Sequence, residues 1–202
     1  NPLETEPGVS GKLYGHKHVL PERPGWYTCA CCPPNVVRLL MSLGKYLWSE
    51  TEDGVYSHIP AGTEAHFDKM DVTVESNYPW DGRVTYHITG KTEEETILGI
   101  HIPSWVRPGS VQVRINGKVK DITADEEKGY LILKRVWEND EVELVFPMKI
   151  RKIYANLKVR EDAGCVAFMR GPIVYCFEGV DNPGLLQSYH IFEDARTEEE
   201  IC

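Results

Sequence analysis

Three of the six cysteines in this chain lie within the stretch CACCPPN, at Cys29, Cys31 and Cys32. The two prolines that follow suit the first turn of a helix, where a missing N–H costs no hydrogen bond. Unpaired N–H groups at such a helix start stabilise negative charge on a neighbouring sulfur. A thiolate can bind a metal or act as a nucleophile. From the spacing alone, packing of small buried thiols is an equally good interpretation.

A complete metal site cannot be assembled from this sequence. The other cysteines, Cys165, Cys176 and Cys202, are isolated, and we expect the first two to lie in the core of β-strands. His16 and His18 have a spacing that can chelate a metal, but no acidic or cysteine partner lies near them in the sequence. Any metal at Cys31 and Cys32 must therefore take its other ligands from outside these 202 residues.

The elements around the cysteines differ on their two sides. Residues 1–28 are rich in proline and glycine, which predicts a long loop, and its Glu4, Glu6 and Glu22 are expected to be solvated charges. After it, apolar residues at helical spacing predict one helix from Pro33 to about Trp48. A second apolar stripe indicates that this helix is buried on more than one side, against partners that the chain does not contain.

Beyond residue 50 the apolar residues alternate. Short β-rich runs separated by Asp81-Gly82, Asn116-Gly117 and Lys128-Gly129 predict an antiparallel β-sandwich over residues 49–148. Residues 149–202 predict further strands, which either complete the sandwich or begin a second β-domain. Only residues 1–48, with the loop and the helix, are predicted to lack strands. The predicted fold class is therefore mainly β.

The tryptophans give weaker signals. Trp26 could stack on a sugar, as could Tyr27, although anchoring the loop is the better interpretation. Trp80 and Trp105 lie at strand ends, where packing is the default and exposure would indicate a carbohydrate-binding face. Trp137 is expected in the core.

Composition excludes several classes of protein. A net charge of -9 argues against nucleic acid as a partner, and no apolar run is long enough to cross a membrane. The chain starts at Asn1 without a signal peptide, which we interpret as the start of a fragment. Unpaired cysteines favour a reducing compartment, so we expect a cytoplasmic location.

Three motifs together resemble glycoside hydrolase family 127, which includes β-L-arabinofuranosidases: NPLE at residues 1–4, CACCPPN at 29–35 and RGPIVYCFEGVDN at 170–182. The resemblance extends over the whole chain but only over the C-terminal part of a family member. It implies that residues 1–48 are the last loop and helix of an (α/α)6-barrel catalytic domain, with the β-sandwich region following.

The resemblance also implies residue roles. Cys31 would be the nucleophile of a retaining glycosidase and, with Cys32, a ligand of Zn²⁺, whereas Cys29 receives no role. A glutamate and a cysteine that complete the zinc site, and the acid/base glutamate, would precede Asn1, so the fragment alone would be inactive. The thiolate of Cys31 would form a thioglycosyl intermediate that water then hydrolyses.

The substrates implied by the family are β-L-arabinofuranosides of plant-type glycans. We also expect a possible homodimer through the β-domains. Two alternatives stay open at this point: a non-catalytic β-sandwich that binds carbohydrate or a protein partner, and a purely structural zinc or buried thiol cluster at the cysteines.

Overall fold

Strands form most of the chain in the computed structural model, which describes residues 30–122, 126–178, 181–182, 184, 188–192 and 194–198. The helices are α1 (Cys32–Ser42), α2 (Gly44–Leu47) and a short 3₁₀ turn η1 (Arg160–Asp162). The strands are β1 (Trp48–Thr51), β2 (Gly54–Ser57), β3 (Thr63–His66), β4 (Asp71–Ser76), β5 (Arg83–Thr89), β6 (Thr96–His101), β7 (Gln112–Ile115), β8 (Lys118–Lys120), β9 (Glu126–Glu127), β10 (Tyr130–Arg135), β11 (Glu141–Val145), β12 (Ile150–Tyr154), β13 (Val166–Arg170) and β14 (Ile173–Tyr175). Among the described residues, no helix is long and apolar enough to cross a membrane.

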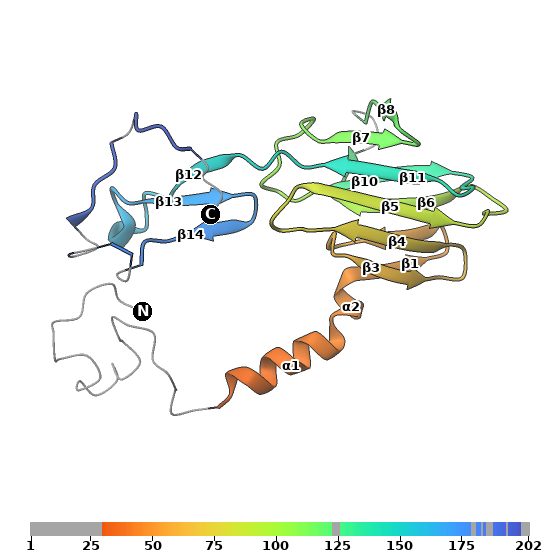
Figure 1. Cartoon of the computed structure of the whole chain (residues 1–202), viewed down its shortest axis with the longest axis horizontal. Helices are drawn as coiled ribbons and strands as arrows, with labels where there is room; N and C mark the ends of the chain where they lie inside the picture. Colours follow the sequence, from red (N-terminus) through yellow and green to blue (C-terminus); the bar gives the residue numbers. More distant parts are fainter. Residues whose placement is uncertain are drawn as a thin grey trace. The chain divides into compact units, whose positions relative to one another are not determined.

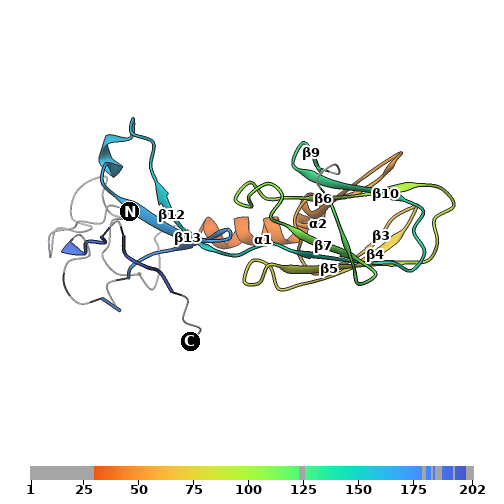
Figure 2. The same ribbon diagram turned by 90° about the horizontal axis from the view of Figure 1, so that it is seen from above.

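Two sheets stack face to face to make the sandwich, as Figure 2 shows. One has the strand order β1-β2-β6-β10-β9 and the other β3-β4-β5-β11-β7-β8 (Figure 1). The mainly β sandwich expected from the sequence is confirmed. One pairing departs from it, because β2 runs parallel to β6, with Gly54 opposite Ile97. Two strands joined by a hairpin run antiparallel, whereas parallel strands need a longer crossover connection. Between β2 and β6 the chain passes through β3, β4 and β5 of the other sheet, which provides such a crossover.

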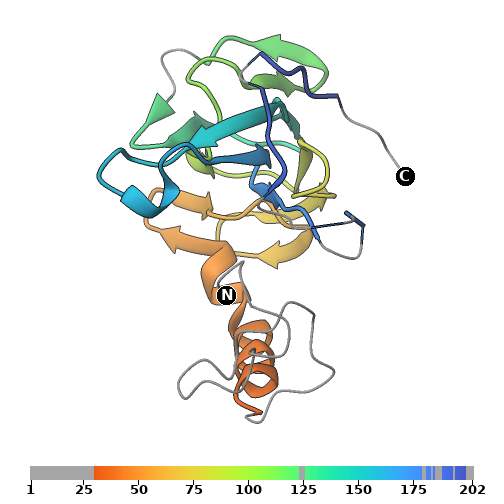
Figure 3. The ribbon, with the colours of Figure 1, turned by 90° about the vertical axis from the view of Figure 1, so that its left-hand side faces the viewer.

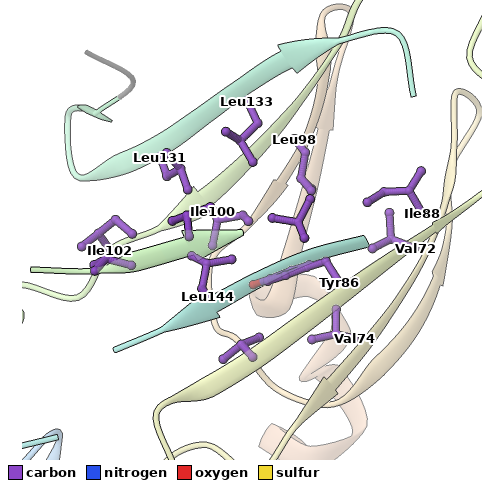
Figure 4. Close-up of a cluster of buried hydrophobic side chains, with 14 of the residues drawn as sticks. Val72, Val74, Tyr86, Ile88, Leu98, Ile100, Ile102, Leu131, Leu133 and Leu144 are labelled. Atoms are coloured by element: carbon purple, nitrogen blue, oxygen red, sulfur yellow. The ribbon is translucent and has the colours of Figure 1, made fainter. Parts of the chain in front are cut away.

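The core lies between the two sheets because every second side chain of their central strands points inward. Figure 4 shows these side chains meeting from both sides: Leu98, Ile100, Leu131 and Leu133 from one sheet, and Val72, Val74, Tyr86, Ile88 and Leu144 from the other. Trp137 is fully buried, as the sequence predicted, and its indole N–H donates to the Thr96 carbonyl oxygen at 2.8 Å. The Tyr86 hydroxyl, which also lies in this layer, is hydrogen-bonded to the Ser57 hydroxyl at 3.0 Å.

The predicted turns connect strands as expected. Asn116 and Gly117 both adopt positive φ, 49° and 75°, between β7 and β8, and so do Lys128 and Gly129 between β9 and β10. Such a pair of left-handed residues matches the twist of a two-residue hairpin. Four strands were not predicted, namely β1, β3, β8 and β9. They are short and mostly exposed, so their sequences lack the apolar alternation of the central strands.

The predicted helix ends earlier than expected. It breaks after Ser42, resumes as α2, and Trp48 begins β1 instead of ending the helix. Figure 3 shows α2 leading directly into β1 of the sandwich. The Trp48 ring packs against Phe67 and Tyr86, with ring centroids 5.4 and 6.2 Å apart. This packing against the sandwich favours a strand at Trp48 over another turn of helix.

Strands β12, β13 and β14 form a separate three-stranded sheet rather than extending either sheet of the sandwich. Arg151 of β12 donates to the Gly171 carbonyl oxygen at 3.0 Å. Arg170 of β13 donates to the Trp80 carbonyl oxygen at 2.9 Å. By its contacts the chain divides into two compact units, residues 40–174 and residues 1–39 with 175–202. The sandwich and the strands up to Val174 thus belong to one unit.

Candidate functional site

Cys31 and Cys32 are both exposed, and their sulfur atoms lie 4.0 Å apart. Cys32 is the first residue of α1 and Cys31 immediately precedes it. The prolines at positions 33 and 34 begin the helix without leaving an intrahelical hydrogen bond unmade, as expected from the sequence. The local fold therefore presents two thiols side by side at a helix start.

The separation of the two sulfurs suits a shared zinc ion. Two thiolates on one tetrahedral Zn²⁺, each bonded at about 2.3 Å, have sulfur atoms about 3.8 Å apart. Among the described residues no three His, Cys, Asp or Glu side chains are grouped closely enough to hold a metal. The geometry thus fits two of the four ligands of such an ion.

Asn35 holds Cys31 from within the helix, a role that the sequence analysis missed. Its side-chain amide donates to the Cys31 carbonyl oxygen at 2.8 Å, and its backbone N–H donates to the same oxygen at 3.3 Å. Two donors on one carbonyl fix the backbone that carries the first thiol. The sequence did contain a signal, since an asparagine four positions after Cys31 lies one helical turn away.

The rest of α1 has no buried residue. Its apolar side chains are exposed by between 53% and 84%: Val36, Val37, Leu39, Leu40 and Met41. The sequence predicted that the partners of this apolar helix lie outside the chain, and that stays a prediction because residues 1–29 are not among the described residues. The burial of this helix on more than one side is therefore not observed here.

Several residues considered in the sequence lie outside the described part of the chain: Glu4, Glu6, His16, His18, Glu22, Trp26, Tyr27, Cys29 and Cys202. The expectation that Cys165 and Cys176 are core residues is wrong. Both are exposed, because Cys165 precedes β13 and Cys176 follows β14 instead of lying within a strand.

The two strand-end tryptophans behave differently. Trp105 is half-buried and packs edge-on against Phe146, with ring centroids 6.2 Å apart, as the default interpretation expected. Trp80 is 65% exposed, so the default of packing under the neighbouring turn is wrong for it. It lies in the loop between β4 and β5, where its backbone N–H donates to the Asn77 carbonyl oxygen at 2.9 Å, while its ring stays in solvent.

A second polar cluster lies on the outer face of the sheet that contains β2, β6 and β10. His58 contacts the Tyr130 hydroxyl at 2.7 Å through Nδ1 and the Ser49 hydroxyl at 2.9 Å through Nε2. The rings of His101 and Tyr130 are 5.3 Å apart. Burial and the neighbouring His58 lower the pKa of His101, while a hydrogen bond to the His58 backbone partly offsets them. These groups satisfy one another, which indicates a structural network.

Two family models match the chain. Residues 54–148 match "Beta-L-arabinofuranosidase, GH127 middle domain", and residues 150–201 match "Glycoside hydrolase family 127 C-terminal domain". Together they span the sandwich from β2 onward and the three-stranded sheet.

The chain is also similar to individual proteins. It is 39% identical over 197 residues to a non-reducing end beta-L-arabinofuranosidase of Bifidobacterium longum subsp. longum, which covers 95% of this chain and 30% of the relative. A GH127 beta-L-arabinofuranosidase from Geobacillus stearothermophilus T6 superimposes with a TM-score of 0.76 at 43% identity, over 90% of this chain and 29% of that one. A further GH127 beta-arabinofuranosidase gives a TM-score of 0.69 at 36% identity, over 80% and 28%. The chain thus spans about 30% of the length of the relatives it matches.

Proposed function

This chain belongs to glycoside hydrolase family 127, and we propose that it forms the C-terminal part of a retaining glycosidase that releases β-L-arabinofuranosyl residues from plant-type glycans. The relatives support the class of reaction, since two of them are named beta-L-arabinofuranosidases and share 39% and 43% identity with the chain. We propose this activity for the whole protein, because this chain covers only about 30% of the length of these relatives.

One observation carries the assignment of the nucleophile. Cys31 and Cys32 place two exposed sulfurs 4.0 Å apart at the start of α1. We assign Cys31 as nucleophile and zinc ligand and Cys32 as zinc ligand, with a glutamate and a cysteine upstream of Asn1 as the other ligands. Bound Zn²⁺ would keep both sulfurs deprotonated at neutral pH.

The reaction that we propose runs in two displacements at the anomeric carbon. In the first, the Cys31 sulfur forms a C–S bond as the glycosidic C–O bond breaks, and the leaving oxygen takes a proton from the upstream acid/base glutamate. In the second, that glutamate removes a proton from water, whose oxygen displaces the Cys31 thiolate and releases the sugar. Two inversions give net retention.

Positioning of the sulfur falls to Asn35. Since the amide and the backbone N–H of Asn35 both donate to the Cys31 carbonyl oxygen, the Cys31 backbone is held relative to α1. A displacement reaction depends on the alignment of the attacking atom. A fixed backbone at Cys31 would therefore lower the entropic part of the activation free energy for attack by its sulfur.

Replacement of each cysteine in the full-length protein tests this function. With Cys31→Ser we expect turnover of an aryl β-L-arabinofuranoside to fall at least about a thousandfold, with the fold retained by circular dichroism. Cys32→Ser is the matched control, since it removes a ligand but leaves the nucleophile, and we expect a smaller loss of turnover. If the cysteines form only a structural zinc clip, both variants would lose zinc and stability equally while residual turnover follows the folded fraction.

Three finer points belong to the same proposal. The 202-residue chain alone should not hydrolyse the aryl substrate, because the acid/base glutamate that we propose lies upstream of Asn1. We propose a cytoplasmic location, since the thiols must stay reduced. We also propose that pairs of molecules associate through the β-domains, which a sedimentation measurement of the full-length protein would test.

A further inference from the structure

Trp80 is the one exposed tryptophan in the part of the chain that the structure describes, with 65% of its surface in solvent. Trp48 and Trp105 are half-buried, and Trp137 is fully buried. Tryptophan buries more apolar area than most side chains do, so a tryptophan left in water gives up a large stabilising contribution. Its ring face is instead available to stack on a ligand.

The backbone of Trp80 is held in place although its ring is in solvent. Its N–H donates to the Asn77 carbonyl oxygen at 2.9 Å, and the N–H of Asp81 donates to the same oxygen at 3.2 Å. The Arg170 guanidinium donates to the Trp80 carbonyl oxygen at 2.9 Å, which joins the loop to β13. Both polar groups of the Trp80 backbone are therefore hydrogen-bonded, and the ring is presented from a fixed turn.

The end of this loop packs closely against the sandwich. The N–H of Phe146 donates to the Gly82 carbonyl oxygen at 2.9 Å. A Cβ atom at Gly82 would lie 2.0 Å from the Phe146 carbonyl oxygen, so a residue without a side chain is needed at this position. The Asp81 carboxylate also accepts a hydrogen bond from the Arg83 N–H at 3.0 Å. A platform that is ordered before the ligand arrives loses little conformational entropy on binding.

Two polar side chains belong to the same turn as the indole. Asn77 and Asp81 are both exposed, and the hydrogen bonds to the Asn77 carbonyl oxygen bring both residues next to Trp80. Within the described residues, neither the side-chain amide of Asn77 nor Oδ2 of Asp81 has a hydrogen-bond partner. An amide donates and accepts, and a carboxylate accepts, so the pair can bind sugar hydroxyls in either direction.

We propose that Trp80, Asn77 and Asp81 form a binding site for one sugar ring of the glycan substrate. The indole would stack on the C–H face of the sugar, while the amide and the carboxylate would form hydrogen bonds with its hydroxyls. The site belongs to the compact unit of residues 40–174, which does not contain Cys31 or Cys32, so we assign it to binding and not to bond cleavage. The choice of a sugar as ligand rests on the proposed glycosidase function, whereas the choice of the site rests on the turn itself.

A protein surface is the other occupant that an exposed tryptophan could have, because tryptophan is enriched in protein–protein interfaces. In that role Trp80 would be covered by a second molecule of this chain or by another protein. The ring would then have no reason to respond to a sugar in the isolated chain, and the polar side chains of Asn77 and Asp81 would have no part in sugar binding.

Titration of the isotope-labelled 202-residue chain with arabinohexaose, followed by NMR, tests the proposal. Each tryptophan gives one indole N–H signal, and that of Trp80 is identified by its loss in Trp80→Ala. We expect this signal to shift saturably with arabinohexaose but not with sorbitol, an open-chain polyol that has no ring face. The backbone signals of residues 77–83 report binding in the variants. Trp80→Ala should weaken binding at least about tenfold, and Trp80→Tyr should weaken it less, because an aromatic face is retained.

Two further variants separate the site from the rest of the surface. Asn77→Ala should weaken binding about 3- to 10-fold, because one hydrogen bond is lost while the backbone carbonyl that closes the turn is kept. Tyr154→Ala is the matched control, since Tyr154 is another exposed aromatic residue of the same unit, with 61% of its surface in solvent. This control should change the affinity less than about twofold.

Three outcomes would overturn the proposal: no saturable shift of the Trp80 indole signal, an equal shift with sorbitol, or an equal loss of affinity in Tyr154→Ala. A shift of the Trp80 signal with protein concentration, in place of a shift with sugar, would assign the ring to a contact between molecules. None of these measurements involves turnover. Their failure would therefore leave the Cys31 assignment intact, and a full-length protein without activity on an aryl β-L-arabinofuranoside would leave sugar binding at Trp80 unaffected.

Discussion

Helix α1, at whose start Cys31 and Cys32 lie, and the β-sandwich differ in how far their apolar side chains are buried. In α1 no residue is buried, and Leu40 is 62% exposed. In the sandwich the chain supplies its own core, where Leu98 and Leu144 are fully buried. Leucines of the two regions thus differ strongly in burial.

This contrast separates the part of the chain that forms a core from the part that presents the cysteines. The core of the sandwich is built from side chains within residues 48–146, whereas α1 contains no buried residue. We therefore expect the sandwich to fold independently of the packing of α1.

Matched leucine replacements test the contrast most strongly. In the 202-residue chain, Leu98→Ala should lower the free energy of unfolding by about 2 to 5 kcal/mol, because it leaves a cavity between the sheets. Leu40→Ala should change it by less than about 0.5 kcal/mol, because that side chain is already in solvent. Urea unfolding measures both. Similar losses for the two variants would show that α1 is packed as firmly as the sandwich.

The sequence predicted the central strands more accurately than the edges, for a physical reason. Runs such as residues 83–90 and 129–137 alternate because one face is buried, and they became β5 and β10. Strands β1, β3 and β8 bury too little for alternation to appear. The parallel pairing of β2 with β6 is set by contacts distant in sequence, which no local pattern encodes.

The features of the candidate site also differ in how well the sequence predicted them. The motif CACCPPN located the thiols and the helix start, since both are local features. It could not predict that Trp80 stays exposed, because this depends on how separate strands are arranged.

A second prediction concerns the hydrogen bond from the Asn35 side chain to the Cys31 carbonyl oxygen. In the full-length protein, Asn35→Ala should lower kcat about 3- to 10-fold and leave KM nearly unchanged, since one hydrogen bond to the Cys31 carbonyl is worth about 0.5 to 1.5 kcal/mol. Alanine favours helix, so the loss should not reflect unfolding. Asn156→Ala, at an exposed asparagine outside α1, should leave kcat unchanged. Equal effects of the two variants would remove the positioning role.

The smallest effect that we expect is a pH dependence of the sandwich. Burial and His58 lower the pKa of His101 in the folded protein, so the unfolded state takes up its proton at higher pH. The stability that His101 contributes is complete above the ordinary histidine pKa of about 6.5 and declines as the pH falls below it. The urea midpoint should therefore drop between pH 7.5 and pH 5.5, and less so in His101→Gln. An equal drop in both proteins would assign the dependence to other groups.

The central claim is that the Cys31 sulfur attacks the sugar, and trapping of the intermediate tests it most directly. The full-length protein, mixed with an activated β-L-arabinofuranoside and quenched in acid during turnover, is digested and analysed by mass spectrometry. We predict one pentosyl unit attached to the peptide that contains Cys31 and Cys32, with fragmentation placing it on Cys31. A pentosyl unit on a carboxylate instead, with Cys31 unmodified, would contradict the account.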